Sequence, residues 1–245
     1  MQIFGRNIVL TALELEIKLS RIQIAANVQG DSIKKIKKLV AKQEGLEIKW
    51  LPPQLIDKIA GANNVHQGVV AEIAEFEYED LHVFIPKLLK EKTLPIIVVC
   101  DQITDPHNLG AIIRSAECAG ADAVIIPDKH SAEINNTVFK TSAGAAFTLP
   151  IIRVSDLKET IDFLHKHKFG VFGLAGEAES SYTELHYENP TAVVIGNEAV
   201  GMRKAIRNNC DELIKIPIHG KSESLNASVA SAVVLYHIVD KRGIR

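Results

Sequence analysis

The sequence predicts an α/β fold in which helices cover both faces of a mainly parallel sheet and a smaller α/β unit comes first. From residue 93 onward, short and mostly apolar runs recur at residues 94–100, 123–126, 149–152, 169–174, 192–195 and 213–216. Stretches with helical spacing separate these runs, at residues 108–119, 131–140, 156–166, 202–209 and 225–239. Apolar runs that alternate with helices in this way are typical of parallel sheets buried between two helical layers.

The smaller α/β unit is predicted within residues 1–77. Helical spacing over residues 8–19 is followed by strand-like alternation over residues 21–25. Asp31 can cap a helix over residues 32–43. The run at residues 68–73 then closes the unit as a further strand.

A change of composition separates the two parts of the chain. Residues 75–80 are acidic and poor in apolar pattern, and Pro86 and Pro95 interrupt the next stretch of the chain. Such segments are typical of connections between domains. We therefore expect a small domain at residues 1–77, a linker at 78–92 and a larger domain at 93–245.

The composition is that of an ordinary globular protein, with 47% hydrophobic and 24% charged residues. Cys100, Cys118 and Cys210 form no C-x-x-C pair, so we expect neither a zinc site nor a disulfide framework, and a reduced, cytoplasmic setting fits. No run approaches the roughly 18 apolar residues of a membrane span, and the start lacks signal-peptide order. The net charge of −2 carries no overall basic footprint, although a local basic patch can lie within a neutral total.

Polar residues follow three of the predicted strands, where ligands bind in parallel sheets. The first loop leads from Asp105 and Pro106 into a helix that carries Asn108 and Arg114. A turn, a helix cap at Asn108 and one surface arginine would explain these residues structurally. A ligand or reaction site at the same loop is the functional alternative.

The second and third loops allow the same two interpretations. Gly196 lets a ligand approach the main chain closely, and Glu198 is expected in the first turn of a helix, where the helix dipole alone would favour a carboxylate. Ser224 and Asn226 precede a nearly all-apolar helix. A plain helix cap needs only one such residue, so this polar cluster favours a further role.

Common nucleotide and metal sites are not supported by the sequence. Gly220-Lys221-Ser222 resembles the end of a P-loop. A P-loop also requires a glycine five positions before Gly220, and that position is Lys215. No G-x-G-x-x-G follows a predicted strand, so a nicotinamide or flavin site is unsupported. No histidines pair at metal-ligand spacing, and no metal is expected.

Together and in this order, the three loops resemble the motifs of the SpoU (TrmH) family of RNA 2′-O-ribose methyltransferases. The matching residues are, loop by loop, Asp105, Pro106, Asn108, Gly110 and Arg114; Gly196, Glu198, Gly201 and Met202; and Ile216, Pro217, Gly220, Ser224, Leu225, Asn226, Ser228, Val229 and Ala230. The match spans residues 94–240. The start, Ile3 to Gly5, and residues 66–71 are similar to RlmB-type members of the family.

The resemblance implies a fold, a cofactor and partners. The expected fold is a SPOUT-type domain with a deep trefoil knot that forms the cofactor pocket, preceded by an L30e-like RNA-binding domain. The expected cofactor is S-adenosylmethionine, and the expected partners are RNA and a second copy of the chain. The expected reaction is methylation of a guanosine of 23S rRNA. A tRNA guanosine is the alternative, and a non-catalytic RNA-binding protein of ribosome assembly is an alternative of a different class.

The resemblance also implies roles for individual residues. The catalytic positions would be Asn108, Arg114, Glu198, Ser224 and Asn226. The cofactor would be held by main chain around Ala175, Gly176, Gly196, Ile216 and Leu225. Because arginine is effectively always protonated, we expect Arg114 to bind an RNA phosphate and stabilise developing negative charge rather than act as the base.

One predicted helix carries a dense group of lysines. Lys34, Lys35, Lys37 and Lys38 fall within five positions, while Ile33, Ile36, Leu39 and Val40 are expected to turn inward. The lysines could contact RNA phosphates or form a solvated helix face, and the sequence leaves both interpretations open.

Overall fold

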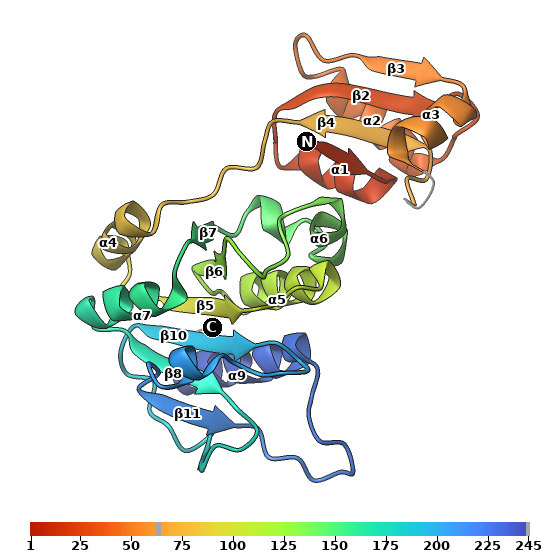
Figure 1. Ribbon diagram of the computed structural model, residues 1–245. Coiled ribbons are helices and arrows are strands. Elements are labelled where there is room, and N and C mark those ends of the chain that lie inside the picture. The colour runs from red at the N-terminus through yellow and green to blue at the C-terminus, as the bar shows by residue number, and fades with distance from the viewer. Residues whose placement is uncertain (62–64, 244–245) are drawn as a thin grey trace. The chain divides into compact units, whose positions relative to one another are not determined.

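A computed structural model of the protein describes residues 1–61 and 65–243 (Figure 1). The chain divides into two compact units. The N-terminal unit consists of Met1–Glu77 with Ile134–Phe147, and the C-terminal unit consists of Tyr78–Glu133 with Thr148–Arg245. Among the described residues, no helix is both long and apolar enough to cross a membrane.

The N-terminal unit contains a four-stranded sheet in the order β1-β4-β2-β3. Its strands are β1 (Gln2–Phe4), β2 (Leu19–Ala25), β3 (Ile48–Leu51) and β4 (Val69–Ile73). β4 is antiparallel to both β1 and β2, and β3 is parallel to β2 at the edge of the sheet. The accompanying helices are α1 (Arg6–Glu14), α2 (Asp31–Val40) and α3 (Pro53–Ala60).

Two predictions for these helices were wrong in detail. The helix expected at residues 8–19 ends at Glu14, because Glu16 adopts a left-handed φ of 58° and Leu19 already begins β2. Asp31 is not a helix cap. Gly30 occupies the N-cap position of α2, and Asp31 lies in the first turn, where the helix dipole favours its carboxylate.

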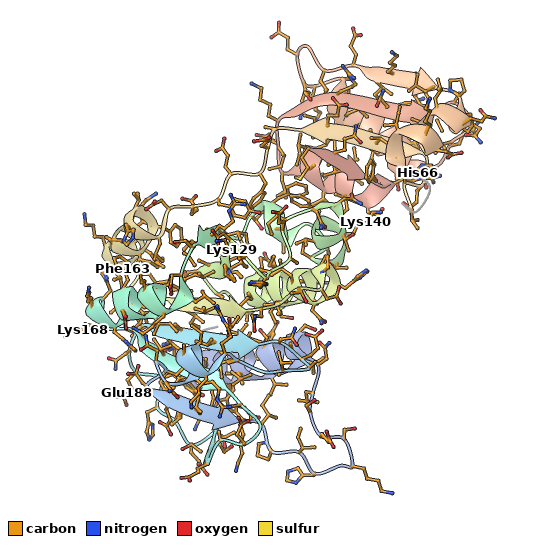
Figure 2. All side chains as sticks on the ribbon, viewed as in Figure 1. His66, Lys129, Lys140, Phe163, Lys168 and Glu188 are labelled. Carbon is orange, nitrogen blue, oxygen red and sulfur yellow. The ribbon has the colours of Figure 1, made fainter. Side chains whose placement is uncertain are left out.

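Residues 134–147 fold with the N-terminal strands, although the sequence groups them with the strands that follow residue 93. They form α6 (Asn136–Thr141) and a short 3₁₀ helix, η1 (Ala145–Phe147). The Phe4 amide donates to Asn136 Oδ1 at 2.7 Å. Phe139 is fully buried against Phe76 and Phe147, with ring centroids 6.1 Å and 4.2 Å away. Lys140, labelled in Figure 2, donates to the Val65 carbonyl at 2.6 Å.

The segment expected as a linker contains a helix, α4 (Leu81–Glu91). Asp80 caps this helix by accepting hydrogen bonds from the amides of His82 and Val83 at 2.8 and 3.0 Å. Leu81, Ile85 and Leu88 are buried in the core of the C-terminal unit. The apolar spacing of these side chains makes residues 81–91 part of that unit's fold.

The C-terminal unit is built on a seven-stranded sheet in the order β7-β6-β5-β10-β8-β11-β9, and every pairing between neighbours is parallel. The strands are β5 (Ile96–Asp101), β6 (Ala123–Pro127), β7 (Ile151–Val154), β8 (Gly170–Leu174), β9 (Ser180–Ser181), β10 (Thr191–Gly196) and β11 (Glu212–Lys215). The helices, besides α4, are α5 (Pro106–Cys118), α7 (Leu157–Lys166), α8 (Lys204–Arg207) and α9 (Ala227–Lys241). The predicted α/β fold with a mainly parallel sheet is confirmed.

Helices cover both faces of this sheet. Ile97 and Val99 of β5 lie in one core cluster with side chains of α4 and α7. Ile96 and Val98 point to the other face and are equally buried. On that other face α5 and α9 pack against each other and against the strands. The central strand β10 lies between β5 and β8, so the loops that follow strands distant in the sequence meet at one edge of the sheet (Figure 1).

Candidate active site

A cavity of about 300 Å³ lies at the carboxyl edge of the C-terminal sheet. It is lined by residues that follow β8, β10 and β11, together with the start of α9. All of the residues predicted to hold the cofactor line it: Ala175, Gly176, Gly196, Ile216 and Leu225. Two of the predicted catalytic residues, Glu198 and Ser224, line it as well. Loops that are far apart in the sequence therefore form one cavity.

Glu198 lies in a tight turn, and the prediction that it begins a helix was wrong. The backbone of Asn197 and Gly201 closes the turn with hydrogen bonds of 3.2 and 2.8 Å. The Asn197 side chain accepts from the amides of Ala199 and Val200, at 2.8 and 3.2 Å. A side chain that binds its own following amides competes with helix formation. Glu198 is consequently exposed at the tip of the turn, at the wall of the cavity.

A buried carboxylate, which the sequence analysis missed, fixes the far end of this loop. Asp101, the last residue of β5, is fully buried. It accepts hydrogen bonds from Arg203, at 2.8 Å from the backbone amide and 2.7 Å from Nε. Asn197 Nδ2 also donates to the carbonyl of Gln102 at 3.0 Å. The loop after β10 is therefore tied at both ends to the loop after β5. The sequence does place Asp101 directly after an apolar run. A buried carboxylate needs a partner, so this position could have indicated an ion pair.

The two glycines of the cavity wall have different structural requirements. A Cβ added at Gly196 would collide with the backbone of Gly201 and Met202, so packing within the protein requires this glycine. Gly196 also lines the cavity, and the close approach of a ligand to its main chain stays a prediction. Apart from its two neighbours in the chain, no atom of the described residues lies within 4 Å of a Cβ added at Gly176. A side chain at Gly176 is thus compatible with the fold.

Asn108 and Asn226 are joined by a hydrogen bond, from Asn226 Nδ2 to Asn108 Oδ1, of 2.9 Å. Asn226 is the N-cap of α9 and also accepts from the Ser228 amide at 2.9 Å. The prediction of Asn108 as a helix cap was wrong, because Asp105 caps α5 by accepting from the His107 amide at 2.9 Å. Asn108 is instead buried within the first turns of α5. Neither asparagine lines the cavity, and together they hold the start of α9 against α5.

Arg114 lies on the same helix as Asn108. It lies exposed on α5, beyond Asn108, and does not line the cavity. Within residues 1–61 and 65–243, it makes no hydrogen bond or ion pair. Its guanidinium is free to bind an external group.

Comparison with known proteins decides the family. The family model described as SpoU rRNA Methylase family matches residues 95–236, and a model described as RNA 2′-O ribose methyltransferase substrate binding matches residues 2–79. The chain belongs to the SpoU rRNA methylase family. The resemblance seen in the three loops is thereby confirmed.

Two relatives of this SpoU family member match along most of their lengths. The 23S rRNA (guanosine-2′-O-)-methyltransferase RlmB of Yersinia pestis is 40% identical over 223 residues, covering 89% of this chain and 88% of that protein. A protein of Staphylococcus haemolyticus (strain JCSC1435), named as a TrmH family tRNA/rRNA methyltransferase, is 38% identical over 240 residues, covering 98% of this chain and 95% of that one.

Solved structures share the fold at lower identity. The SpoU methyltransferase AviRb from Streptomyces viridochromogenes, in complex with AdoMet, has a TM-score of 0.84 at 24% identity, covering 100% of this chain and 91% of that one. An AdoMet-bound rRNA methyltransferase from Sinorhizobium meliloti has a TM-score of 0.80 at 23% identity, covering 100% and 87%. At these identities the likeness shows the fold alone.

The charged side chains of the cavity wall are of both signs. Glu177, Glu198 and Glu223 are acidic, and Arg207 and Lys215 are basic. Arg207 Nη2 pairs with Glu177 Oε1 at 2.6 Å. This SpoU family member therefore offers groups for both a cationic and an anionic part of one small ligand.

Other nucleophiles and ligand clusters are poorly placed in the described parts of the chain. Burial raises the pKa of Cys100 and of Cys210 to about 12, so neither thiol is a thiolate near neutral pH. No group of three or more His, Cys, Asp or Glu side chains is arranged to hold a metal ion in the part of the chain that the structure describes.

The predicted RNA-binding lysines all lie on α2 of the N-terminal unit. Lys34, Lys35, Lys37 and Lys38 are exposed, whereas Ile33, Ile36 and Val40 are buried and Leu39 is partly buried. Lys34 pairs with Asp31 at 3.1 Å. The predicted amphipathic division of this helix is confirmed.

Proposed function

We propose that this protein transfers a methyl group from S-adenosylmethionine to the ribose 2′-oxygen of a guanosine in 23S rRNA. The observation that carries the proposal is the gathering of the three SpoU motif loops around one sheet edge, with Gly196, Glu198 and Ser224 at the wall of one cavity. Membership of the SpoU family supports the reaction, and the relative named for 23S rRNA guanosine methylation supports the substrate.

The cavity residues fit the cofactor. A volume of about 300 Å³ lies within the range of small-molecule pockets. Ile195, Ile216 and Leu225 offer an aliphatic wall for an adenine ring. The glutamates of the wall suit the ammonium and the sulfonium, and Arg207 and Lys215 suit the carboxylate. When bound, S-adenosylmethionine supplies a methyl group already activated by a positively charged sulfur.

The protein's task is then to orient the acceptor hydroxyl and to assist the loss of its proton. Arg114 would bind an RNA phosphate beside the target ribose and stabilise the negative charge that develops on the 2′-oxygen. The substrate phosphate or a water molecule would take the proton, since arginine remains protonated at neutral pH. Glu198 and Ser224 would orient the ribose, and the Asn108–Asn226 hydrogen bond would act as a positioning contact for the loop that carries Ser224.

A homodimer would bring Arg114 to a cavity. On α9, Val229 and Tyr236 are 48% and 52% exposed, and a helix so rich in apolar residues favours burial on more than one side. Arg114 lies on α5, which packs against α9. We therefore infer a dimer contact on α5 and α9 and propose that the partner subunit's Arg114 serves each cavity.

The N-terminal unit would select the RNA, while the C-terminal unit carries out the reaction. The match of residues 2–79 to a substrate-binding family model and the four exposed lysines of α2 support this division. A substrate in the large ribosomal RNA would put the activity in the cytoplasm.

Transfer of a labelled methyl group from S-adenosylmethionine to unmodified 23S rRNA by the purified protein tests the proposal. We expect the labelled methyl group on the 2′-oxygen of one guanosine in 23S rRNA and on no nucleotide of tRNA. Labelling of tRNA alone would show that the substrate is tRNA rather than 23S rRNA. Failure to bind S-adenosylmethionine by calorimetry would instead support the non-catalytic RNA-binding alternative.

A further inference from the structure

Trp50 is the only tryptophan of the chain and lies in an unusual position for that residue. It belongs to β3, the edge strand of the N-terminal sheet (Figure 1). Its side chain is 40% exposed. Tryptophan is largely buried in most folds, so an exposed indole on a sheet edge indicates a contact surface.

A lysine of α2 lies directly on this indole. Lys37 Nζ is 4.5 Å from the centroid of the Trp50 ring, within the range of a cation–π contact. The contact places one end of the lysine group of α2 beside the exposed aromatic side chain. Residues 31–51, which contain both, carry six lysines and three acidic residues in a chain whose net charge is −2. The positive charge is thus concentrated where the aromatic side chain is exposed.

We propose that Trp50 and the lysines of α2 form a docking surface for an unpaired nucleotide of RNA, whose base stacks on the indole while its phosphates contact the lysines. The inference rests on the proposed RNA substrate and adds that the RNA segment bound by the N-terminal unit is unpaired. An exposed aromatic ring beside a basic helix is the chemistry that holds single-stranded RNA. A base pair inside a duplex keeps both faces stacked on its neighbours, so only the terminal pairs of a duplex present a free face to the indole. The recognised part of the substrate is therefore a loop, a bulge or an end.

The single tryptophan provides a probe of this site in the intact chain. Titration with a single-stranded RNA oligonucleotide should quench the Trp50 fluorescence, and a duplex of the same length should quench it much less. Trp50→Leu should weaken binding of the single strand roughly ten-fold, as expected for loss of one base–aromatic stack, with little change in the salt dependence. Lys37→Gln should instead lower the slope of log affinity against log salt by about one.

Two further variants control for folding and for general surface effects. Trp50→Phe keeps a ring and should recover most of the affinity. Leu55→Ala changes another exposed apolar side chain of the same unit, 46% exposed on α3, and should bind RNA normally. All variants should bind S-adenosylmethionine as the unchanged chain does. Equal affinity of Trp50→Leu and the unchanged chain for the single strand, or equal quenching by the duplex, would overturn the inference.

The test separates this inference from the proposed function. If the unchanged chain methylates rRNA and Trp50→Leu has the same KM for it, the docking surface is wrong and the methyltransferase stands. If the unchanged chain methylates no RNA but its fluorescence responds to the single strand and not to the duplex, the proposed reaction is wrong and the docking surface stands.

Discussion

Arg203 donates two hydrogen bonds to the fully buried carboxylate of Asp101, from its amide at 2.8 Å and from Nε at 2.7 Å. The two residues are 102 positions apart. The contact joins the end of β5 to the segment after β10 that forms one wall of the cavity. It therefore links the first and second motif loops of this SpoU family member.

Replacing Asp101 with asparagine should weaken this link. The amide group retains the shape but loses the charge and presents a donor to Arg203, so we expect the free energy of unfolding to fall by about 2 kcal/mol. The affinity for S-adenosylmethionine should fall in the folded variant. Denaturant unfolding and calorimetry measure the two effects. Asp128→Asn, an exposed aspartate that directly follows β6, is the matched control and should change neither quantity.

Gly176→Leu should separate cofactor binding from folding. Apart from its chain neighbours, the added side chain meets no atom of the described residues at its Cβ, and Gly176 lines the cavity. We expect an unchanged melting temperature and a Kd for S-adenosylmethionine raised on the order of ten-fold or more, equivalent to about 1.4 kcal/mol. Gly196→Ala should instead lower the melting temperature, because its Cβ collides with the backbone of Gly201 and Met202. If folded Gly176→Leu binds S-adenosylmethionine normally, the cofactor does not bind in this cavity.

Arg114→Ala should lower the rate of methyl transfer about 10²–10³-fold, the magnitude typical of losing one group that stabilises transition-state charge. Since Arg114 does not line the cavity of its own chain, cofactor affinity should stay within a few-fold. A parallel loss of rate and cofactor binding would contradict the assigned role. The pH–rate profile of Arg114→Lys adds a second test, because a shifted pKa of one essential base would make Arg114 the proton acceptor.

Mixing inactive subunits tests whether the partner subunit's Arg114 serves the cavity. Arg114→Ala and Gly176→Leu chains should each have little activity alone when S-adenosylmethionine is kept well below its raised Kd for Gly176→Leu. After random exchange of subunits in a dimer, the mixture should recover about a quarter of the active sites. Each mixed dimer would pair one intact cavity with one intact arginine. Mixtures that remain inactive although the subunits exchange would place Arg114 and the cavity on the same chain.

The hydrogen bond between Asn108 and Asn226 should appear as a coupling energy. Asn108→Ala, Asn226→Ala and the double variant form a cycle, and we expect a coupling of about 1 kcal/mol in the free energy of unfolding. Asn226→Ala should cost more than Asn108→Ala, because it also removes the cap of α9. Additive effects of the two substitutions would show that the contact contributes nothing.

Changing Lys34, Lys35, Lys37 and Lys38 to glutamine in the full chain should weaken RNA binding and flatten its dependence on salt. The full chain is needed for this test. Residues 134–147 pack with the N-terminal strands, and removing residues 1–77 would uncover the buried Phe139. An unchanged salt slope would show that the lysines form only a solvated helix face.

The strands of the C-terminal sheet were predictable because burial on both faces leaves a continuous apolar run, as in β5 and β10. The lining residues were predictable only through the family motifs. The turn at Glu198 was missed because the Asn197 side chain, rather than the residue pattern, decides the local conformation. The order of the strands, with β10 between β5 and β8, depends on contacts between distant segments. The same is true of the Asp101–Arg203 pair and of the assignment of residues 134–147 to the N-terminal unit. The trefoil knot and the L30e-like character of the N-terminal unit stay predictions of the family resemblance.

The assigned reaction and the role of Arg114 can be tested together by mapping ribose 2′-O-methylation across rRNA and tRNA from cells with the gene, without it and with the Arg114→Ala form. We expect one guanosine of 23S rRNA to be methylated only in cells with the unchanged gene, and the Arg114→Ala form to fail to restore that methylation. Identical methylation maps in all three kinds of cell would show that this protein does not methylate rRNA or tRNA.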